Sequence, residues 1–384
     1  MENQEIPVID LTDRSLSEAD YLMQEWAYDT FDKPDMPMSE FRMVKLAEGY
    51  NGFFLHIDHR LADSCALIIL INDIMQLYCH LKFGAPYPKE LASFEKMLEK
   101  DIAKANNPKR FAKDVDFWKE CLIKYGEPLY SDIRGKGVLE RSRKLYGNEA
   151  LRAADLVKDD LSVGVRDFVL EKEAAVEMFD FCQTHQISVN NLLILGIRTY
   201  LSKMNEGQED ISVRSFISRR STKDEWTSGG SRTVAFPCRT VISPDIEFLT
   251  AVRIVQEVQN NIYLHSNYDT ALLDRQIREM FPHPAMTCYE SVWLTYQPMP
   301  VKIDNPYIKD LPVRSRWYPN GVAVKKIYLT VSHKADGSMN FSFHYQTAIH
   351  TGHEMEIFYY YLMRIIFKGI EESDMTIGNI IETV

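Results

Sequence analysis

The chain has 384 residues, more than a single hydrophobic core usually supports, so we expect two lobes. Hydrophobic residues make up 45% of the composition, which is enough for large cores. The 55 acidic residues outnumber the 44 basic ones and leave a formal charge of -11, which argues against nucleic acid or an anionic membrane surface as the main partner.

The first part of the chain predicts two strands around a turn, followed by three helices. Two strands, 41–47 and 52–57, flank a turn at Glu48-Gly-Tyr-Asn51. The apolar segment Cys65–Leu81 then predicts a buried helix, which Ser64 is placed to cap and Gly84 to end. Amphipathic helices are predicted at 90–104 and 111–124.

The stretch 126–147 is rich in charge, Gly and Pro, and we predict that it connects the lobes. The N-terminal lobe would then comprise 1–147 and the C-terminal lobe 148–384. The second half keeps the mixed α and β order. Its predicted strands are 161–170, 210–218, 234–242, 291–296, 327–331 and 340–346, and its predicted helices are 173–185, 188–204, 248–260 and 351–368.

The segment between the predicted strand and the buried helix concentrates ionisable residues, namely His56, Asp58, His59 and Asp63. Ionisable groups between two buried elements must be paired, hydrogen-bonded or functional. A histidine and an aspartate four positions apart can also simply hold a turn together. The segment is therefore the candidate site, with a structural role as the alternative.

The remaining signals predict a cytoplasmic protein. The first residues lack the basic start and apolar core of a signal peptide. The longest apolar run, Cys65–Ile71, is too short to span a bilayer, and Asn72 and Asp73 interrupt the helix around it, so we predict no membrane span. The six cysteines are scattered without a close pair, which favours reduced core residues over disulfides or a zinc site.

The turn Asp58-His-Arg-Leu-Ala-Asp-Ser64 resembles the HHxxxDG motif of the condensation domains of nonribosomal peptide synthetases. Further segments resemble family motifs in the same order along nearly the whole chain. They are Val8-Ile-Asp-Leu11 before the motif, Asp116-Phe-Trp-Lys119, Ser215-Phe-Ile-Ser-Arg-Arg220, Phe236-Pro237 followed by Arg239, and Trp293-Leu-Thr-Tyr-Gln297. The resemblance implies a two-lobed α/β fold like that of chloramphenicol acetyltransferase, with mixed sheets and flanking helices.

The resemblance also implies a set of roles. His59 would position or deprotonate the attacking amine or hydroxyl, while Asp63 would pair with Arg220 and shape the turn. Asp58, Ser64 and Tyr296 would line the site. No metal and no permanently bound cofactor are implied, because the acyl group arrives as a phosphopantetheine thioester on a carrier protein or CoA. The expected partners are an acyl or peptidyl carrier protein and a small-molecule acyl donor and acceptor.

The chain departs from the family pattern at three places. Asp58 stands where the motif has its first histidine, and Ser64 where it has glycine. A carboxylate beside His59 would favour the protonated imidazole and weaken it as a base, unless the two side chains face opposite sides of an extended segment. The family also carries further strands and a helix before the point that matches Met1, so the N-terminal lobe is expected to lack its opening elements.

Two alternatives follow from the same residues. A noncatalytic relative that binds carrier proteins or acyl chains is the main one. The other is a metal-dependent hydrolase, because His56-x-Asp58-His59 resembles part of an HxHxDH metal motif. Phe54 occupies the position where that motif has its first histidine.

Overall fold

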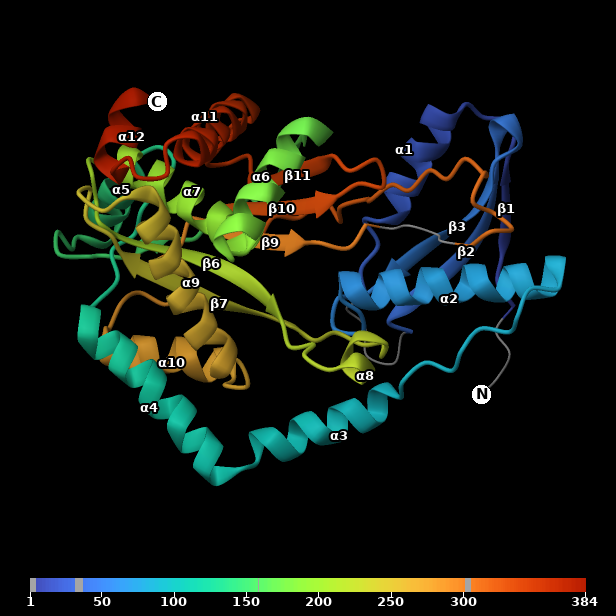
Figure 1. Cartoon of the computed structure of the whole chain (residues 1–384), viewed down its shortest axis with the longest axis horizontal. Coiled ribbons are helices and arrows are strands. Elements are labelled where there is room, and N and C mark those ends of the chain that lie inside the picture. Colours follow the sequence, from blue (N-terminus) through green and yellow to red (C-terminus); the bar gives the residue numbers. More distant parts are fainter. Residues whose placement is uncertain (1–4, 32–36, 158, 301–304) are drawn as a thin grey trace. The chain divides into compact units, whose positions relative to one another are not determined.

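The structure is a computed structural model that describes residues 5–31, 37–157, 159–300 and 305–384 (Figure 1). Its helices are α1 Leu16–Trp26, α2 Ser64–Phe83, α3 Phe94–Ala105, α4 Pro108–Tyr125, α5 Gly137–Tyr146, α6 Lys172–His185, α7 Val189–Met204, α8 Lys223–Trp226, α9 Phe248–Leu264, α10 Thr270–Met280, α11 Gly352–Glu371 and α12 Ile377–Thr383. Its strands are β1 Val8–Leu11, β2 Ser39–Leu46, β3 Asn51–Ile57, β4 Ala154–Asp155, β5 Val163–Leu170, β6 Asp210–Ser218, β7 Thr233–Val241, β8 Thr287–Cys288, β9 Val292–Gln297, β10 Ile327–His333 and β11 Met339–Gln346.

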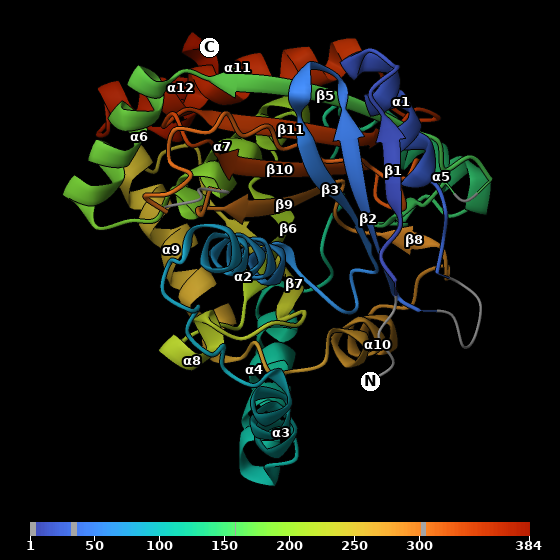
Figure 2. The ribbon, with the colours of Figure 1, turned by 90° about the vertical axis from the view of Figure 1, so that its right-hand side faces the viewer.

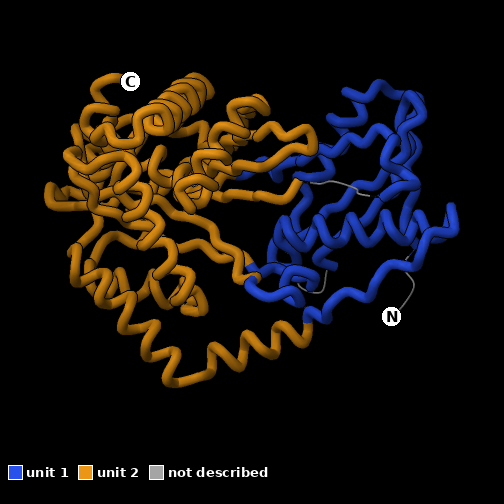
Figure 3. Tube along the Cα trace, in the orientation of Figure 1, with its two compact units in different colours: residues 1–94, 221–232, 301–322 blue, residues 95–220, 233–300, 323–384 orange. Residues whose placement is uncertain are grey.

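The chain divides into two compact units, which Figure 3 shows in different colours. Unit 1 comprises residues 1–94, 221–232 and 301–322, and unit 2 comprises the rest. The division predicted from composition differs from this one, because residues 95–147 belong to unit 2. The charged stretch 126–147 contains helix α5 rather than an open connection. The later segments 221–232 and 301–322 also belong to unit 1, so no single boundary along the sequence can separate the two units.

Unit 1 contains a three-stranded sheet in the order β1-β2-β3 (Figure 2). Strand β1 is parallel to β2, and β3 is antiparallel to it with Phe41 opposite Leu55, as the predicted turn between 47 and 52 requires. Helix α1 packs on one face of the sheet, where Met23, Val44 and Phe54 are buried together. This small core fixes the direction in which β3 leads into the motif turn.

Helix α2 is less buried than its composition predicts. Asp63, not Ser64, is its N-cap, and Gly84 ends it in a left-handed conformation as expected. Only Cys65, Ala66 and Cys79 of the helix are buried. By length and composition α2 could cross a membrane, with a mean hydropathy of 1.4, because the two polar residues at 72 and 73 do not lower the average enough. Core helices of water-soluble proteins pass the same test.

Unit 2 is built on a six-stranded mixed sheet in the order β5-β11-β10-β9-β6-β7. Apolar side chains alternate along these strands, and one face packs against α6, α7, α9 and α11 in the largest core of the chain. Ser188 caps α7, as predicted, and Gly196 of that helix lies so close to Leu362 of α11 that a Cβ would clash with it. The predicted hairpin of β10 and β11 is confirmed, with Val331 opposite Phe341.

A cluster of buried ionisable side chains adjoins this core. The Lys326 ammonium donates to the Tyr130 hydroxyl at 2.9 Å, and that hydroxyl donates to Asp132. The His350 ring is also buried, with Nε2 at 4.0 Å from Asp132 and Nδ1 at 3.8 Å from Glu354. Burial holds the pKa of His350 below its ordinary value; Asp132 and Glu354 oppose this effect, while Lys326 and Arg134 reinforce it.

The buried His350 predicts a loss of stability in acid. An unfolded histidine takes up a proton near pH 6.5, whereas the folded His350 resists protonation until a lower pH. The free energy of unfolding should therefore fall by about 1.4 kcal/mol per pH unit between pH 6.5 and the lowered pKa. Denaturant titration at pH 7.5 and 5.5 should show a smaller drop for His350→Gln than for the wild type. The exposed His353→Gln should behave as the wild type does, and a His350→Gln drop equal to that of the wild type contradicts the prediction.

Candidate functional site

The motif residues lie on a short turn between β3 and α2. The strand ends at Ile57, the N–H of Leu61 donates to the Asp58 carbonyl at 2.9 Å, and α2 begins at Ser64. His59 occupies the second position of this turn, and its side chain is exposed. Within the described residues no hydrogen-bonding partner of its ring is found. The sequence-predicted succession of strand, turn and helix is confirmed, and it presents a free imidazole.

Asp58 is held by its neighbour Arg60 rather than by His59. Its carboxylate accepts from the Arg60 Nε and Nη2 at 2.9 Å each and from the Arg60 backbone N–H at 2.8 Å. These hydrogen bonds, the side-chain contact first, lower the pKa of Asp58 below its ordinary value. The carboxylate next to His59 is thus already compensated by a cation.

The Asp58 to Arg60 pair predicts that loss of the carboxylate is tolerated. We expect Asp58→Asn to change kcat/KM by less than about threefold and Tm by less than about 2 °C, because an exposed ion pair contributes little. Arg60→Met is the informative comparison, since it leaves the Asp58 charge beside His59 uncompensated and should lower activity more. An activity loss above about tenfold in Asp58→Asn would assign Asp58 a direct role.

Asp63 is buried, with 2% of its surface exposed, and it joins two segments of unit 1. Its Oδ1 accepts from the Ala66 N–H at 2.9 Å and caps α2, while Oδ2 accepts from the Arg232 N–H at 2.8 Å. The expected capping role of Ser64 is therefore taken by Asp63, and Ser64 is the half-buried first residue of the helix. The carboxylate holds the motif turn against the segment 221–232.

The segment 221–232 contributes two buried charged residues that were not predicted from the sequence. The Arg232 guanidinium lies 3.2 Å from the Glu225 carboxylate, and both side chains are almost fully buried. Glu225 also accepts from the N–H groups of Ser221 and Thr222. Thr222-Lys-Asp-Glu225 matches the capping-box pattern, the one local signal that marks this segment as more than a polar loop.

The other predicted site residues lie in unit 2. Arg220 follows β6 and is buried, and its pairing with Asp63 stays a prediction. Tyr296 lies on the helix-covered face of the sheet, where its hydroxyl and the His333 Nε2 are 2.7 Å apart. Burial raises the pKa of Tyr296 above its ordinary value. That its side chain lines the site also stays a prediction.

His56 has the character of a strand residue. It lies on β3, and its ring is 4.4 Å from the Phe31 ring between centroids. Burial lowers the pKa of His56, so the neutral form is favoured. Among the described parts of the chain, no group of three or more His, Cys, Asp or Glu side chains is placed to hold a metal ion. The hydrolase alternative therefore has no ligand set among these residues.

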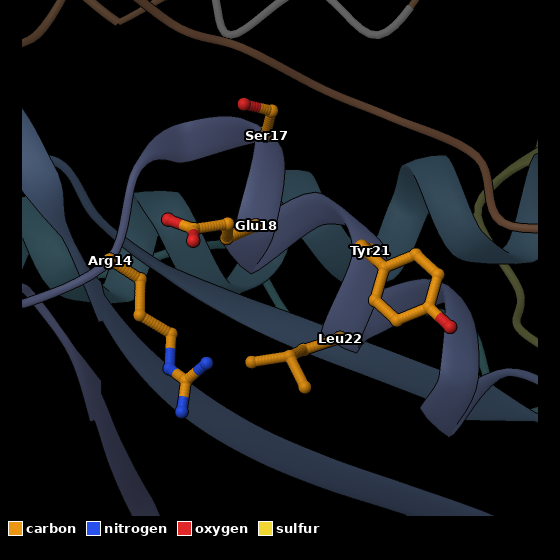
Figure 4. A pocket seen from close by; sticks show the side chains of 5 residues that line it. All are labelled: Arg14, Ser17, Glu18, Tyr21 and Leu22. Atoms are coloured by element: carbon orange, nitrogen blue, oxygen red, sulfur yellow. The ribbon is translucent and has the colours of Figure 1, made fainter.

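An open hollow of about 340 Å³ lies beside the first turns of α1 (Figure 4). It is lined by Arg14, Ser17, Glu18, Tyr21 and Leu22. Glu18 is already used in the capping box of α1, where it accepts from the Ser15 N–H at 2.8 Å. The hollow contains none of the motif residues and pairs no nucleophile with a base, so the motif turn remains the candidate site.

Two mixed sheets with flanking helices place the chain in the α/β class, and the motif turn between β3 and α2 has the position that the resemblance to condensation domains implies. The chain belongs to the condensation-domain family, whose model matches residues 2–381. Among curated proteins, two different subunits of plipastatin synthase from Bacillus subtilis (strain 168) are similar to it. One is 21% identical over 96% of this chain, and the other is 22% identical over 83%. The chain spans only 14% and 8% of the length of these two relatives.

Solved structures show the same fold. The condensation domain from the monacolin K polyketide synthase MokA matches with a TM-score of 0.74 and 13% identity, over 97% of this chain and 81% of that one. The starter condensation domain of rhizomide synthetase RzmA, a mutant in complex with C8-CoA and Leu-SNAC, matches with a TM-score of 0.73 and 16% identity, over 98% and 79%. The fold expected from the sequence resemblance is therefore confirmed.

Proposed function

We propose that the chain is an acyltransferase of the condensation type. It would transfer an acyl group from a carrier-protein or CoA thioester to an amine or hydroxyl and form an amide or ester. The observation that carries the proposal is His59, an exposed imidazole without a hydrogen-bonding partner in the described structure, on a turn that the buried Asp63 holds in place.

In the proposed reaction, the His59 imidazole accepts the proton of the attacking amine or hydroxyl. The nucleophile forms a bond to the thioester carbonyl carbon, and the carbon–sulfur bond breaks. The proton then passes to the leaving thiolate, so that a free phosphopantetheine thiol remains and the imidazole is neutral again. Asp63 is a positioning residue in this scheme, with Arg220 as its proposed ionic partner and with Ser64 and Tyr296 in the lining.

The comparisons support this reaction class at the level of the family. Condensation domains of nonribosomal peptide synthetases act with carrier proteins, and the RzmA domain was solved with an acyl-CoA and an aminoacyl thioester analogue. We propose that this chain, too, takes its acyl group from a phosphopantetheine thioester. We further propose that an acyl or peptidyl carrier protein is its partner and that it acts in the cytoplasm. The activities of whole synthetase subunits, of which the chain covers a small part, are not included.

A noncatalytic role in binding carrier proteins or acyl chains is the second candidate, because Asp58 replaces the first histidine of the motif. An assay with octanoyl-CoA and leucine N-acetylcysteamine thioester separates the two. Amide formation above the buffer rate, detected by mass spectrometry, is the expected result. Binding of octanoyl-CoA without any turnover, also with other amines and alcohols, would favour the binding role.

A further inference from the structure

The sheet of unit 2 carries a cluster of aromatic and basic side chains on the face opposite helices α6, α7, α9 and α11. Arg214 of β6 stands beside Trp293 of β9, which stands beside Tyr328 of β10. Phe216 lies two residues after Arg214 on the same face, and Lys325 lies two positions before Ile327, the first residue of β10. All five side chains are half-buried, whereas the residues that alternate with them along the strands are buried.

Three aromatic rings surround the Lys325 ammonium. Its Nζ lies 4.8 Å from the ring centroid of Trp293, 5.2 Å from that of Tyr328 and 5.8 Å from that of Phe216. The Arg214 guanidinium lies 4.9 Å from the Trp293 centroid. Burial lowers the pKa of Lys325, and the charge of Arg214 adds to the effect. The rings attract the cation through their faces but cannot accept its hydrogen bonds at full strength.

Lys325 differs from its basic neighbours in lacking an anionic or hydrogen-bonding partner. Arg214 donates to Asp274 at 2.7 Å, and the adjacent Lys326 donates to Tyr130. For Lys325, the described residues offer no hydrogen-bond acceptor and no carboxylate within ion-pair distance. A half-buried ammonium that is packed against aromatic rings loses part of its hydration, which is costly. An anion placed against it would relieve that cost.

We propose that the aromatic–lysine cluster, formed by Arg214, Phe216, Trp293, Lys325 and Tyr328, binds a ligand with a carboxylate on a flat apolar body. One carboxylate matches the single uncompensated positive charge, whereas a phosphate dianion would exceed it. The rings of Trp293, Phe216 and Tyr328 would contact the apolar body, which favours a planar or aromatic one. The site uses no residue of the motif turn and does not rest on the acyl-transfer proposal.

Calorimetric titration of the full chain with 3-phenylpropanoate at low ionic strength tests this site. We expect binding with a Kd of about 1 mM or tighter, as suits a ligand of this size. The neutral analogue 3-phenylpropanamide should bind about tenfold or more weakly, because it lacks the charge-assisted hydrogen bond. Equal affinity for acid and amide, tighter binding of phenyl phosphate, or no binding of the acid would overturn the proposal.

Variants localise the binding. Lys325→Met keeps the length of the side chain without its charge, and it should weaken 3-phenylpropanoate about tenfold or more. Lys325→Arg should retain binding, and Lys113→Met, which removes an exposed charge on α4, should leave the affinity unchanged. Circular dichroism and Tm establish that each variant is folded. Undiminished binding by a folded Lys325→Met variant would sink the assignment, and so would loss of binding in Lys325→Arg.

Discussion

Replacement of His59 by alanine is expected to lower the rate of acyl transfer by about 10²–10⁴-fold, the usual contribution of a general base. The same change should leave Tm almost unaltered. The His59 side chain is exposed and has no hydrogen-bonding partner in the described structure, so its removal strands no buried group. Rates from acyl-CoA consumption and Tm from thermal melting measure the two effects independently.

The matched control for this variant is His353→Ala, which removes another exposed imidazole, on α11. Its rate and Tm should equal those of the wild type. Activity of His59→Ala within about twofold of the wild type would refute the base role and leave the binding alternative. A large drop in Tm would show instead that the imidazole stabilises the turn, and the loss of rate could then not be assigned to proton transfer.

The sequence predicts the local structure around the site well, because the signals there are local. The short apolar run of Phe53, Phe54 and Leu55 indicates β3, and Gly84 marks the end of α2. Strand β6 has the predicted bounds, 210–218, and its apolar residues Ile211, Val213 and Ile217 keep the period of two that a strand requires. The resemblance to the condensation-domain motifs, taken in chain order, predicts the family that the comparison identifies.

Long-range contacts account for what the sequence does not predict. Arg232 donates to Asp63 across 169 positions of the chain, and no pattern near either residue indicates this. The predicted burial of α2 is wrong for a related reason. Its apolar composition indicates burial, but the degree of burial depends on neighbours such as Ile308, which packs against Cys79 from a distant segment. The ion pair of Arg60 with Asp58 is a local contact that the sequence does not predict. Because His59 is adjacent to Asp58 in the motif, the sequence indicates His59 as the group that the carboxylate would affect.

Replacement of Asp63 by alanine is expected to destabilise the fold by about 2–4 kcal/mol. The change removes the N-cap of α2, which costs about 1 kcal/mol. It also leaves the buried N–H of Arg232 without the Asp63 carboxylate as its hydrogen-bond acceptor, which costs about 1–3 kcal/mol. Denaturant unfolding measures the loss. Asp63→Asn should lose about 1 kcal/mol less than Asp63→Ala, because its side-chain oxygen can still cap the helix while its amide cannot accept from Arg232. Equal losses in the two variants would contradict this assignment.

The Asp63 variants also decide whether Arg220 is the ionic partner that the family resemblance implies. If the two side chains pair, Arg220→Met removes the same interaction as Asp63→Asn, and the double variant should be more stable than the sum of the single losses predicts, by about 0.5–3 kcal/mol. Additive losses, within about 0.5 kcal/mol, would show that the Asp63 carboxylate is held without Arg220. In that case Arg220 serves another partner, and the geometry of the motif turn is set within unit 1 by the segment 221–232.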